Sequence, residues 1–142
     1  MNIRSFRQDL RRLERITTLQ NRKLGCCDDL SLPQCHLLLE IEKLGEAGVV
    51  QLAANLGLDK STMSRTASSL VENAYIQRHS DASDKRSVQL KLAPKGKQIV
   101  RRINREADLF YSSLVDKISA RDQQKISQSL ELLVSFLSEN SA

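Results

Sequence analysis

Hydroxyl and basic side chains recur at helical spacing in the middle of the chain. Residues three and four apart lie on one face of a helix, so this stretch could present several hydrogen-bonding groups to one partner. An arginine can donate two parallel hydrogen bonds to guanine, and hydroxyls can bond to base edges or phosphates. The alternative is an ordinary solvated helix face. The candidate residues are Lys60, Ser61, Thr62, Ser64, Arg65 and Ser68.

A second candidate group lies in the charged stretch from Ser80 to Arg86. Arg86 would suit a narrow minor groove, where the negative potential of DNA is enhanced. We expect Lys85 to meet phosphate. Asp84 would be unfavourable beside DNA unless a basic neighbour pairs with it, so we expect it to orient this stretch. The alternative is an exposed turn without a ligand.

Cys26, Cys27 and Cys35 lie within ten positions of one another. Thiolates prefer soft ions, so these residues could bind a heavy metal or a metalloid such as arsenite. In a second version, one cysteine is oxidised by peroxide and another resolves it. In a third, Cys35 only fills the core and the pair is incidental. A C-x-x-C pattern is absent and His36 and His79 stand alone, which argues against a structural zinc site.

Two short helices joined by a tight turn would position the first candidate group. The pattern predicts a helix over Val49 to Leu56, and Gly57, four residues after Ala53, permits close packing and a sharp turn. Asp59 stands where it can cap a second helix that runs to about Asn73. The side chains of this second helix expected in the core are Met63, Ala67, Leu70 and Val71.

Two strands are predicted to follow. Tyr75 to His79 forms a short strand, and Val88, Leu90 and Leu92 alternate with polar residues as in a half-buried strand. Helix, turn, helix and a two-stranded ribbon with a basic tip make a winged helix-turn-helix, a shape that fits one helix into the DNA major groove.

Longer apolar stripes flank this module. They predict helices over residues 3–21, from Pro94 to about 118, and over about 121–138. Another helix begins at Ser31-Leu32-Pro33-Gln34, which reads as a capping box with Leu30 and Cys35 as its hydrophobic staple. One small domain offers too little surface to cover the outer stripes. We therefore expect two copies to interleave their first and last helices and to read a pseudo-palindrome.

The composition restricts the remaining function classes. The chain has 142 residues, and Lys plus Arg exceed Asp plus Glu by 22 − 17 = 5, a balance compatible with an anionic partner. No apolar run reaches the roughly 20 residues that span a bilayer, and the first residues lack the apolar segment of a signal peptide. We therefore expect a cytoplasmic protein without a membrane partner. Phosphate-binding glycine loops and catalytic serine or zinc-protease motifs are absent, so we expect no enzyme.

Several short sequence motifs match those of one protein family. The most specific is Asp84-x-Arg86-Ser87-Val88-x-Leu90-x-Leu92. The others are Leu32-x-Gln34-x-x-Leu37-Leu38-x-x-Ile41, Leu52-Ala53-x-x-Leu56-Gly57, Ser61-Thr62-Met63-Ser64-Arg65, Leu70, Arg78 and Gly96. In these motifs the chain resembles the MarR family of bacterial winged-helix regulators over nearly its whole length.

The resemblance implies a dimeric transcriptional regulator, usually a repressor. It implies that the helix matching Lys60 to Asn73 enters the major groove, that Arg86 points toward the minor groove, and that Asp84 holds the wing. An effector or an oxidised cysteine would act near the first, second and fifth helices. Two departures concern backbone positions: Ala74 stands where the family usually has Gly, unless Asn73 takes the left-handed conformation, and Ala93 stands where it usually has a capping Thr.

These observations predict a mainly α fold with a small β-wing, a winged helix-turn-helix with N- and C-terminal dimerisation helices. We expect one domain over residues 1–142, in which 31–93 bind DNA and 1–30 and 94–142 supply the linker and the dimerisation helices. The expected function is a dimeric transcriptional repressor that binds a pseudo-palindromic operator in double-stranded DNA, is released by an effector and requires no cofactor. One candidate effector is a metalloid, metal or oxidant that acts on the thiols. Alternatives are release by a small organic or phenolic ligand with structural cysteines, and a protein-interaction module without DNA binding.

Overall fold

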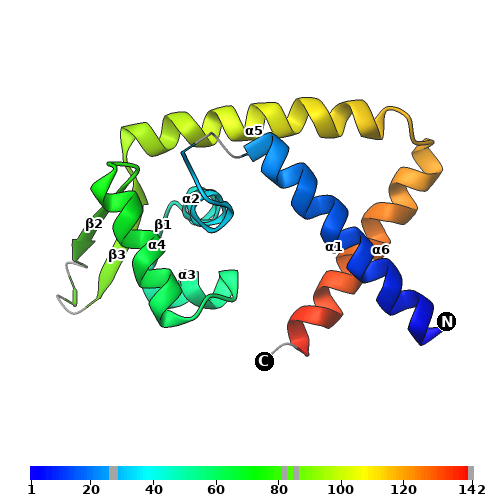
Figure 1. Cartoon of the computed structure of the whole chain (residues 1–142), viewed down its shortest axis with the longest axis horizontal. Helices are drawn as coiled ribbons and strands as arrows, with labels where there is room; N and C mark the ends of the chain where they lie inside the picture. The colour runs from blue at the N-terminus through cyan, green and yellow to red at the C-terminus, as the bar shows by residue number, and fades with distance from the viewer. Residues whose placement is uncertain (26–28, 81–82, 85–86, 141–142) are drawn as a thin grey trace. The chain divides into compact units, whose positions relative to one another are not determined.

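The computed structural model describes residues 1–25, 29–80, 83–84 and 87–140. It is mainly helical with a small antiparallel sheet, which confirms the predicted fold class (Figure 1). The chain forms two compact units, Met1–Glu106 and Ala107–Ala142. In chain order the elements are α1 Ile3–Gly25, α2 Leu32–Leu44, β1 Glu46–Gly48, α3 Val49–Leu56, α4 Lys60–Glu72, β2 Ile76–Ser80, β3 Val88–Leu92, α5 Pro94–Val115 and α6 Ala120–Glu139.

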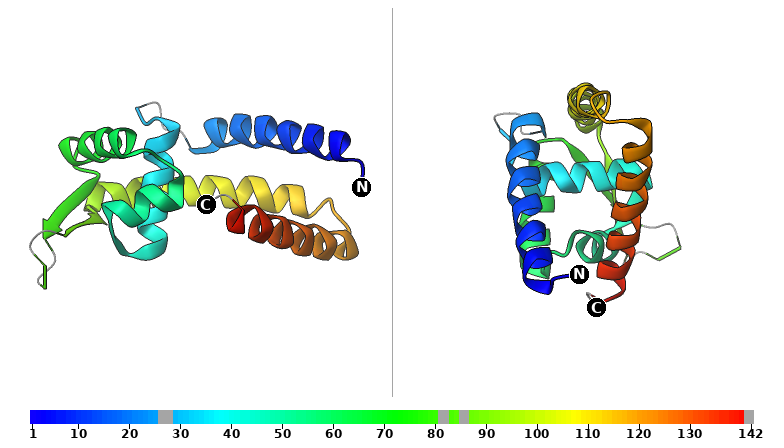
Figure 2. Two further views of the ribbon diagram at one scale, coloured as in Figure 1. Left: turned by 90° about the horizontal axis from the view of Figure 1, so that it is seen from below. Right: turned by 90° about the vertical axis from the view of Figure 1, so that its right-hand side faces the viewer.

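The sheet of the first unit has the strand order β1-β3-β2, with antiparallel pairing throughout. The β2–β3 ribbon projects beyond the neighbouring helices, as expected of a wing (Figure 2). Sequence reasoning missed β1, which pairs Ala47 with Leu90. Only Ala47 of its three residues is buried, so β1 is too short for an alternating pattern to reveal it.

The start of α2 confirms the predicted capping box. The backbone N–H of Gln34 donates to Ser31 Oγ at 3.4 Å, and the backbone N–H of Ser31 donates to Gln34 Oε1 at 2.7 Å. Leu30 and Cys35 are both buried in the core, as their staple positions predict. Gly45 ends the helix at a positive φ of 78°, which glycine adopts without steric cost.

Helix α2 is the centre of the first unit. It contacts α1, α3, α4, β1 and β3. Leu37, Leu38 and Ile41 on α2 are completely shielded from solvent and pack in one cluster with residues of the surrounding elements. Contributions from the other elements include Leu52, Met63, Leu70, Ile76, Leu90 and Val100. This aliphatic core holds α3, α4 and the wing in fixed positions relative to α2.

The end of α4 settles a question that the sequence left open. Ala74 has a positive φ of 60°, whereas Asn73 has φ −89°. Ala74 therefore carries the left-handed conformation itself, at a steric cost that glycine would not have. The backbone N–H of Tyr75 then donates to Leu70 O at 2.9 Å, which closes the helix end.

The backbone of Tyr75, just before β2, lies very close to the helix α5. A Cβ placed on Gly96 would lie only 2.0 Å from Tyr75 O, so this position excludes any side chain. Ala93 precedes α5 and is buried, and its backbone N–H donates to Tyr75 O at 3.0 Å. This hydrogen bond, rather than a side-chain cap, fixes the entry to α5.

In the second unit, α5 ends at Val115, earlier than the predicted end at about Ile118, and α6 begins at Ala120. The side chain of Gln123 explains the stop, because its amide donates to Val115 O at 3.0 Å and to Ile118 O at 2.9 Å. Ser119 caps α6 by accepting from the backbone N–H of Asp122. No residue of α6 is buried within the chain, although the helix is rich in apolar side chains. Across the described part of the chain, no helix is both long and apolar enough to cross a bilayer.

Candidate nucleic-acid interface

Helix α4 begins at the cap that the sequence predicts. Asp59 Oδ1 accepts from the backbone N–H of Thr62 at 2.8 Å, and Asp59 Oδ2 accepts from Thr62 Oγ1 at 2.7 Å. The Thr62 hydroxyl, followed by its backbone N–H, lowers the pKa of Asp59 below its ordinary value. At neutral pH the cap is therefore a charged carboxylate, and the Thr62 hydroxyl is already engaged with it.

The two faces of α4 differ in burial as predicted. Met63, Ala67 and Leu70 are almost fully buried, and the buried Thr66 hydroxyl donates to Thr62 O at 2.8 Å. The opposite face leaves four of the candidate residues open to solvent, and we call this group the α4 ridge: Lys60, Ser61, Ser64 and Arg65. Within the ridge, two cations and two hydroxyls can reach a partner.

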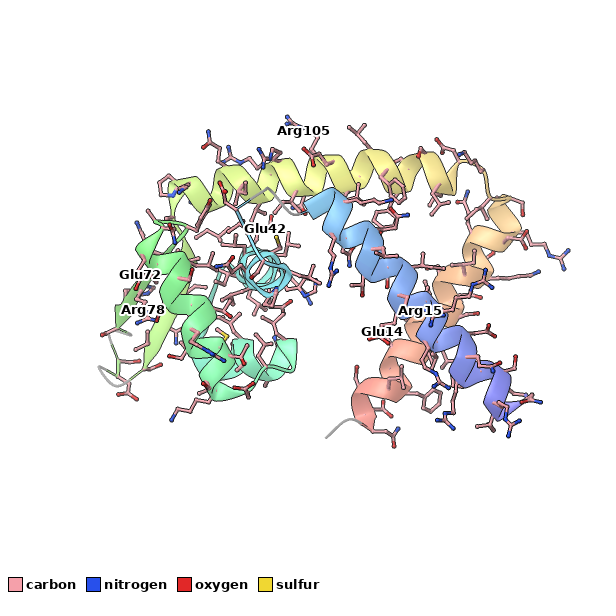
Figure 3. All side chains as sticks on the ribbon, viewed as in Figure 1. Glu14, Arg15, Glu42, Glu72, Arg78 and Arg105 are labelled. Carbon is pink, nitrogen blue, oxygen red and sulfur yellow. The ribbon has the colours of Figure 1, made fainter. Side chains whose placement is uncertain are left out.

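Ser68 continues the outer face of α4 but is half-buried. Arg78 of β2 donates from Nη2 to Ser68 Oγ at 3.0 Å and so brings a third cation next to the ridge (Figure 3). Sequence reasoning did not select Arg78 as a site residue. A signal was available, because residues two apart on a strand share a face, and Ile76 is buried against the core. Arg78 therefore had to lie on the side of the sheet where α4 packs.

Gln34 fixes the position of α4 relative to α2. Its Oε1 accepts from the backbone of Ser31 in the capping box, while its Nε2 donates to Ser69 Oγ on α4 at 2.9 Å. One side chain thus closes the start of α2 and bonds to the middle of α4. Because both of its polar atoms are engaged, the direction of α4 is tied to that of α2.

A hollow of about 430 Å³ adjoins the α4 ridge. It is lined by Gly48, Val49, Val50, Lys60, Ser64, Ala67, Arg78, Ser87 and Val88. Lys60 and Arg78 place positive charge around it. Gly48 is the N-cap residue of α3 and supplies no side-chain hydrogen bond, so the first N–H groups of α3 keep their partial positive charge. A phosphate group fits the charge of this hollow.

At the wing, the backbone N–H of Ser87 donates to Asp84 O at 3.0 Å, and Asp84 is exposed. Lys85 and Arg86 lie outside the described residues, so their predicted contacts remain predictions.

Among the candidate thiols, Cys35 is only 2% exposed and belongs to the core cluster. Cys26 and Cys27 lie outside the described residues. No group of three or more His, Cys, Asp or Glu side chains that could hold a metal ion occurs in the part of the chain that the structure describes. His36 is exposed on α2. Nε2 of His79 on β2 contacts the Glu46 carboxylate on β1, across the central strand β3.

Comparison with known proteins identifies the family. The sequence profile of the MarR family matches residues 30–88, which run from the start of α2 into the wing. The chain belongs to the MarR family. A curated relative in Bacillus subtilis (strain 168), the uncharacterized HTH-type transcriptional regulator YxaD, is 30% identical over 95 residues, which are 67% of this chain and 66% of the relative.

Solved structures show the same fold. FabT of Streptococcus pneumoniae in complex with DNA superimposes with a TM-score of 0.83 at 21% identity, covering 97% of this chain and 99% of FabT. The PcaV transcriptional regulator of Streptomyces coelicolor, in complex with its natural ligand, gives a TM-score of 0.72 at 16% identity, covering 95% of this chain and 96% of PcaV. The MarR fold therefore extends over nearly the whole chain, beyond the segment that the family profile matches.

Proposed function

We propose that this MarR-family protein is a homodimeric repressor that binds a pseudo-palindromic site in double-stranded DNA. The observation that carries the proposal is the α4 ridge, which exposes Lys60, Ser61, Ser64 and Arg65 on a helix fixed by a charged cap and by Gln34. A rigid helix with cations and hydroxyls on its outer face suits the major groove. The DNA in the FabT structure is consistent with this use of the fold.

Each candidate residue has a role in the proposed complex. Arg65 reads guanine, while Lys60 and Arg78 meet phosphates around the hollow beside α3. Ser61 and Ser64 contact base edges or phosphates. Thr62 and Ser68 act within the protein, through Asp59 and Arg78, and hold the contacting groups in place. Arg86 enters the minor groove, Lys85 meets phosphate and Asp84 orients the wing.

The proposed dimer accounts for apolar surface that one chain leaves uncovered. In the first unit, α1 exposes Ile3, Leu13, Ile16 and Leu19. In the second unit, α6 exposes Ile126, Leu130, Leu132, Val134, Phe136 and Leu137. Such extended apolar faces are unusual on a monomer and typical of an interface. A two-fold dimer would present two α4 helices to half-sites about one DNA turn apart.

For the effector, the burial of Cys35 argues against this thiol as the first group to react, so we propose an organic ligand as the first candidate. A thiol that is 2% exposed cannot meet peroxide or arsenite without opening the core around α2. PcaV, solved in complex with its natural ligand, has the same fold and is consistent with release by a bound ligand. Thiol sensing through Cys26, Cys27 and Cys35 is the second candidate. Replacing all three by serine would abolish release by arsenite or peroxide under that candidate and leave release by an organic inducer intact.

The test of DNA binding is fluorescence anisotropy on a labelled duplex from upstream of the protein's own gene, at fixed salt. We expect Arg65→Ala to weaken binding by roughly 1–3 kcal/mol, because a bidentate contact to guanine is lost. The matched control is Arg121→Ala on α6, which removes the same charge far along the chain and should leave affinity unchanged. Equal affinities of both variants and the unaltered protein would remove Arg65 from the interface.

A further inference from the structure

A second basic site lies on α5, apart from the α4 ridge. A hollow of about 490 Å³, which we call the α5 hollow, is lined by Tyr75, Lys95, Gln98, Ile99, Arg101, Arg102 and Arg105. The opposite face of this part of α5 is buried through Gly96, Val100 and Ile103. The hollow thus opens on the outer face of the helix, where Arg105 points away from the rest of the first unit (Figure 3).

Every charged residue that lines the α5 hollow is basic. The first acidic residue of α5, Glu106, comes directly after residues 94–105, which contain five basic residues: Lys95, Lys97, Arg101, Arg102 and Arg105. Within the described residues, no carboxylate lies within ion-pair distance of Lys95, Arg101 or Arg105. Like charges three and four residues apart repel one another on a helix. An anion bound in the hollow would relieve that repulsion.

The shape and chemistry of the hollow select the kind of anion. Arginine side chains bind phosphate through paired, charge-assisted hydrogen bonds, and both Arg101 and Arg105 border the hollow. Tyr75 and Ile99 are half-buried and give it an apolar part that can cover an organic group. Its volume falls within the range of about 300–1,000 Å³ for small-molecule sites.

Lys95 connects the hollow to the recognition helix. Its Nζ donates to Asn73 O at 2.9 Å and lies 4.2 Å from the centre of the Tyr75 ring. Asn73 is the C-cap residue of α4, so this ammonium neutralises the negative end of that helix. Lys95 also lines the hollow, where an anion would compete with Asn73 for its ammonium group.

We propose that the α5 hollow binds a small organic polyphosphate, such as a nucleoside triphosphate, and that the bound phosphates draw Lys95 away from the end of α4. The binding step stands independently of the proposed DNA function, whereas any consequence for repression rests on it. The hollow would then give the regulator an input from phosphorylated metabolites, on a surface that the DNA contacts do not use.

Binding is tested by isothermal titration calorimetry of the purified full chain with ATP, inorganic tripolyphosphate and citrate at equal ionic strength. We expect ATP to bind, Arg101→Gln/Arg105→Gln to weaken it by about tenfold or more because two charge-assisted contacts are lost, and citrate to bind more weakly. Tripolyphosphate as tight as ATP would assign the affinity to the phosphates alone. Citrate as tight as ATP would overturn the selection of phosphate.

Two variants locate the site. Arg11→Gln/Arg15→Gln on α1 removes the same charge from an exposed helix, and Arg65→Gln removes a cation from the α4 ridge. Both should bind ATP as the unaltered protein does. If either weakens binding as much as the α5 double variant, the anion responds to overall charge or occupies the DNA face, and the proposal is wrong.

The link to α4 is tested by hydrogen exchange, without DNA. The amides of Asn73, Ala74 and Tyr75 donate to carbonyls near the end of α4, so saturating ATP should speed their exchange when Lys95 leaves. Lys95→Met should show the faster exchange already without ATP and little further change on adding it. Unchanged exchange in the ATP-saturated protein would overturn the link while leaving the binding site intact.

Discussion

The left-handed backbone at Ala74 is the clearest case of a residue held against its own preference. Its φ of 60° lies where a Cβ meets the following carbonyl oxygen. The strain persists because both neighbours are fixed: Tyr75 N–H bonds to Leu70 O, and Tyr75 O accepts from Ala93 N–H. The turn from α4 into the wing therefore carries a small, local steric strain.

Replacing that alanine should stabilise the protein. We expect Ala74→Gly to raise the free energy of unfolding by about 0.5–1 kcal/mol, the relieved strain minus the added freedom of the unfolded chain. Urea unfolding at one protein concentration measures this change. Ala54→Gly in α3, an exposed helical site with ordinary backbone, should lower stability by about 1 kcal/mol instead. A loss of stability in Ala74→Gly would show that the turn is not strained.

At this scale the sequence predicted the side chains better than the backbone. Helical spacing located Lys60, Ser61, Ser64 and Arg65 on one exposed face, because periodicity is a local property. Helical spacing could not show whether Asn73 or Ala74 takes the left-handed conformation, because both lie at a helix end where tertiary hydrogen bonds determine the backbone. The alternation of its strand placed Arg78 on the side of α4, but its bond to Ser68 joins residues ten positions apart on two elements and leaves no local pattern.

At the scale of elements, the sequence predicted each helix but not the contacts between them. The capping box at Ser31 can be recognised in the sequence as a four-residue motif. The hydrogen bond from Gln34 to Ser69 joins residues 35 positions apart and leaves no local pattern. The strand β1 was missed for a related reason, since it exists only through its pairing with β3. Local chemistry thus predicted where elements begin, and the core around α2 determined how they meet.

The double role of Gln34 predicts unequal effects of two substitutions. Gln34→Ala removes both the capping contact and the bond to α4, so we expect a loss of about 1.5–2.5 kcal/mol in the free energy of unfolding. Ser69→Ala removes only the bond between helices and should cost about 1 kcal/mol or less. Urea unfolding of both variants and of the double variant measures the coupling. Equal losses in the two single variants would mean that the capping contact contributes nothing.

At the scale of the whole molecule, apolar surface is unevenly distributed. The first unit has a compact core, whereas α6 buries no residue within the chain. A helix with several exposed leucines and a phenylalanine cannot gain stability from its own chain in the usual way, because most helices depend on packing of their apolar face. In the sequence, this uncovered surface appeared as apolar stripes on the outer helices. Composition alone could not show what covers those stripes.

We expect a charge on the apolar face of α6 to break the proposed dimer. Leu130 is 45% exposed in the single chain, and Leu130→Glu should convert the proposed dimer into a monomer, because a carboxylate would be buried without a counter-charge. Sedimentation velocity measures the change in mass. Gln124→Glu adds the same charge at an exposed polar position of α6 and should remain dimeric. A dimeric Leu130→Glu would place the interface elsewhere.

The side chain of Gln34 also sets a limit on how such a protein can be switched. Because it joins the first turn of α2 to the middle of α4, a rotation of α4 against α2 would break the hydrogen bond from Gln34 Nε2 to Ser69 Oγ. A signal that rotates the start of α2 by a small angle would therefore also change the angle at which α4 meets the major groove in the proposed complex. In the proposed dimer, both α4 helices would then shift against their half-sites.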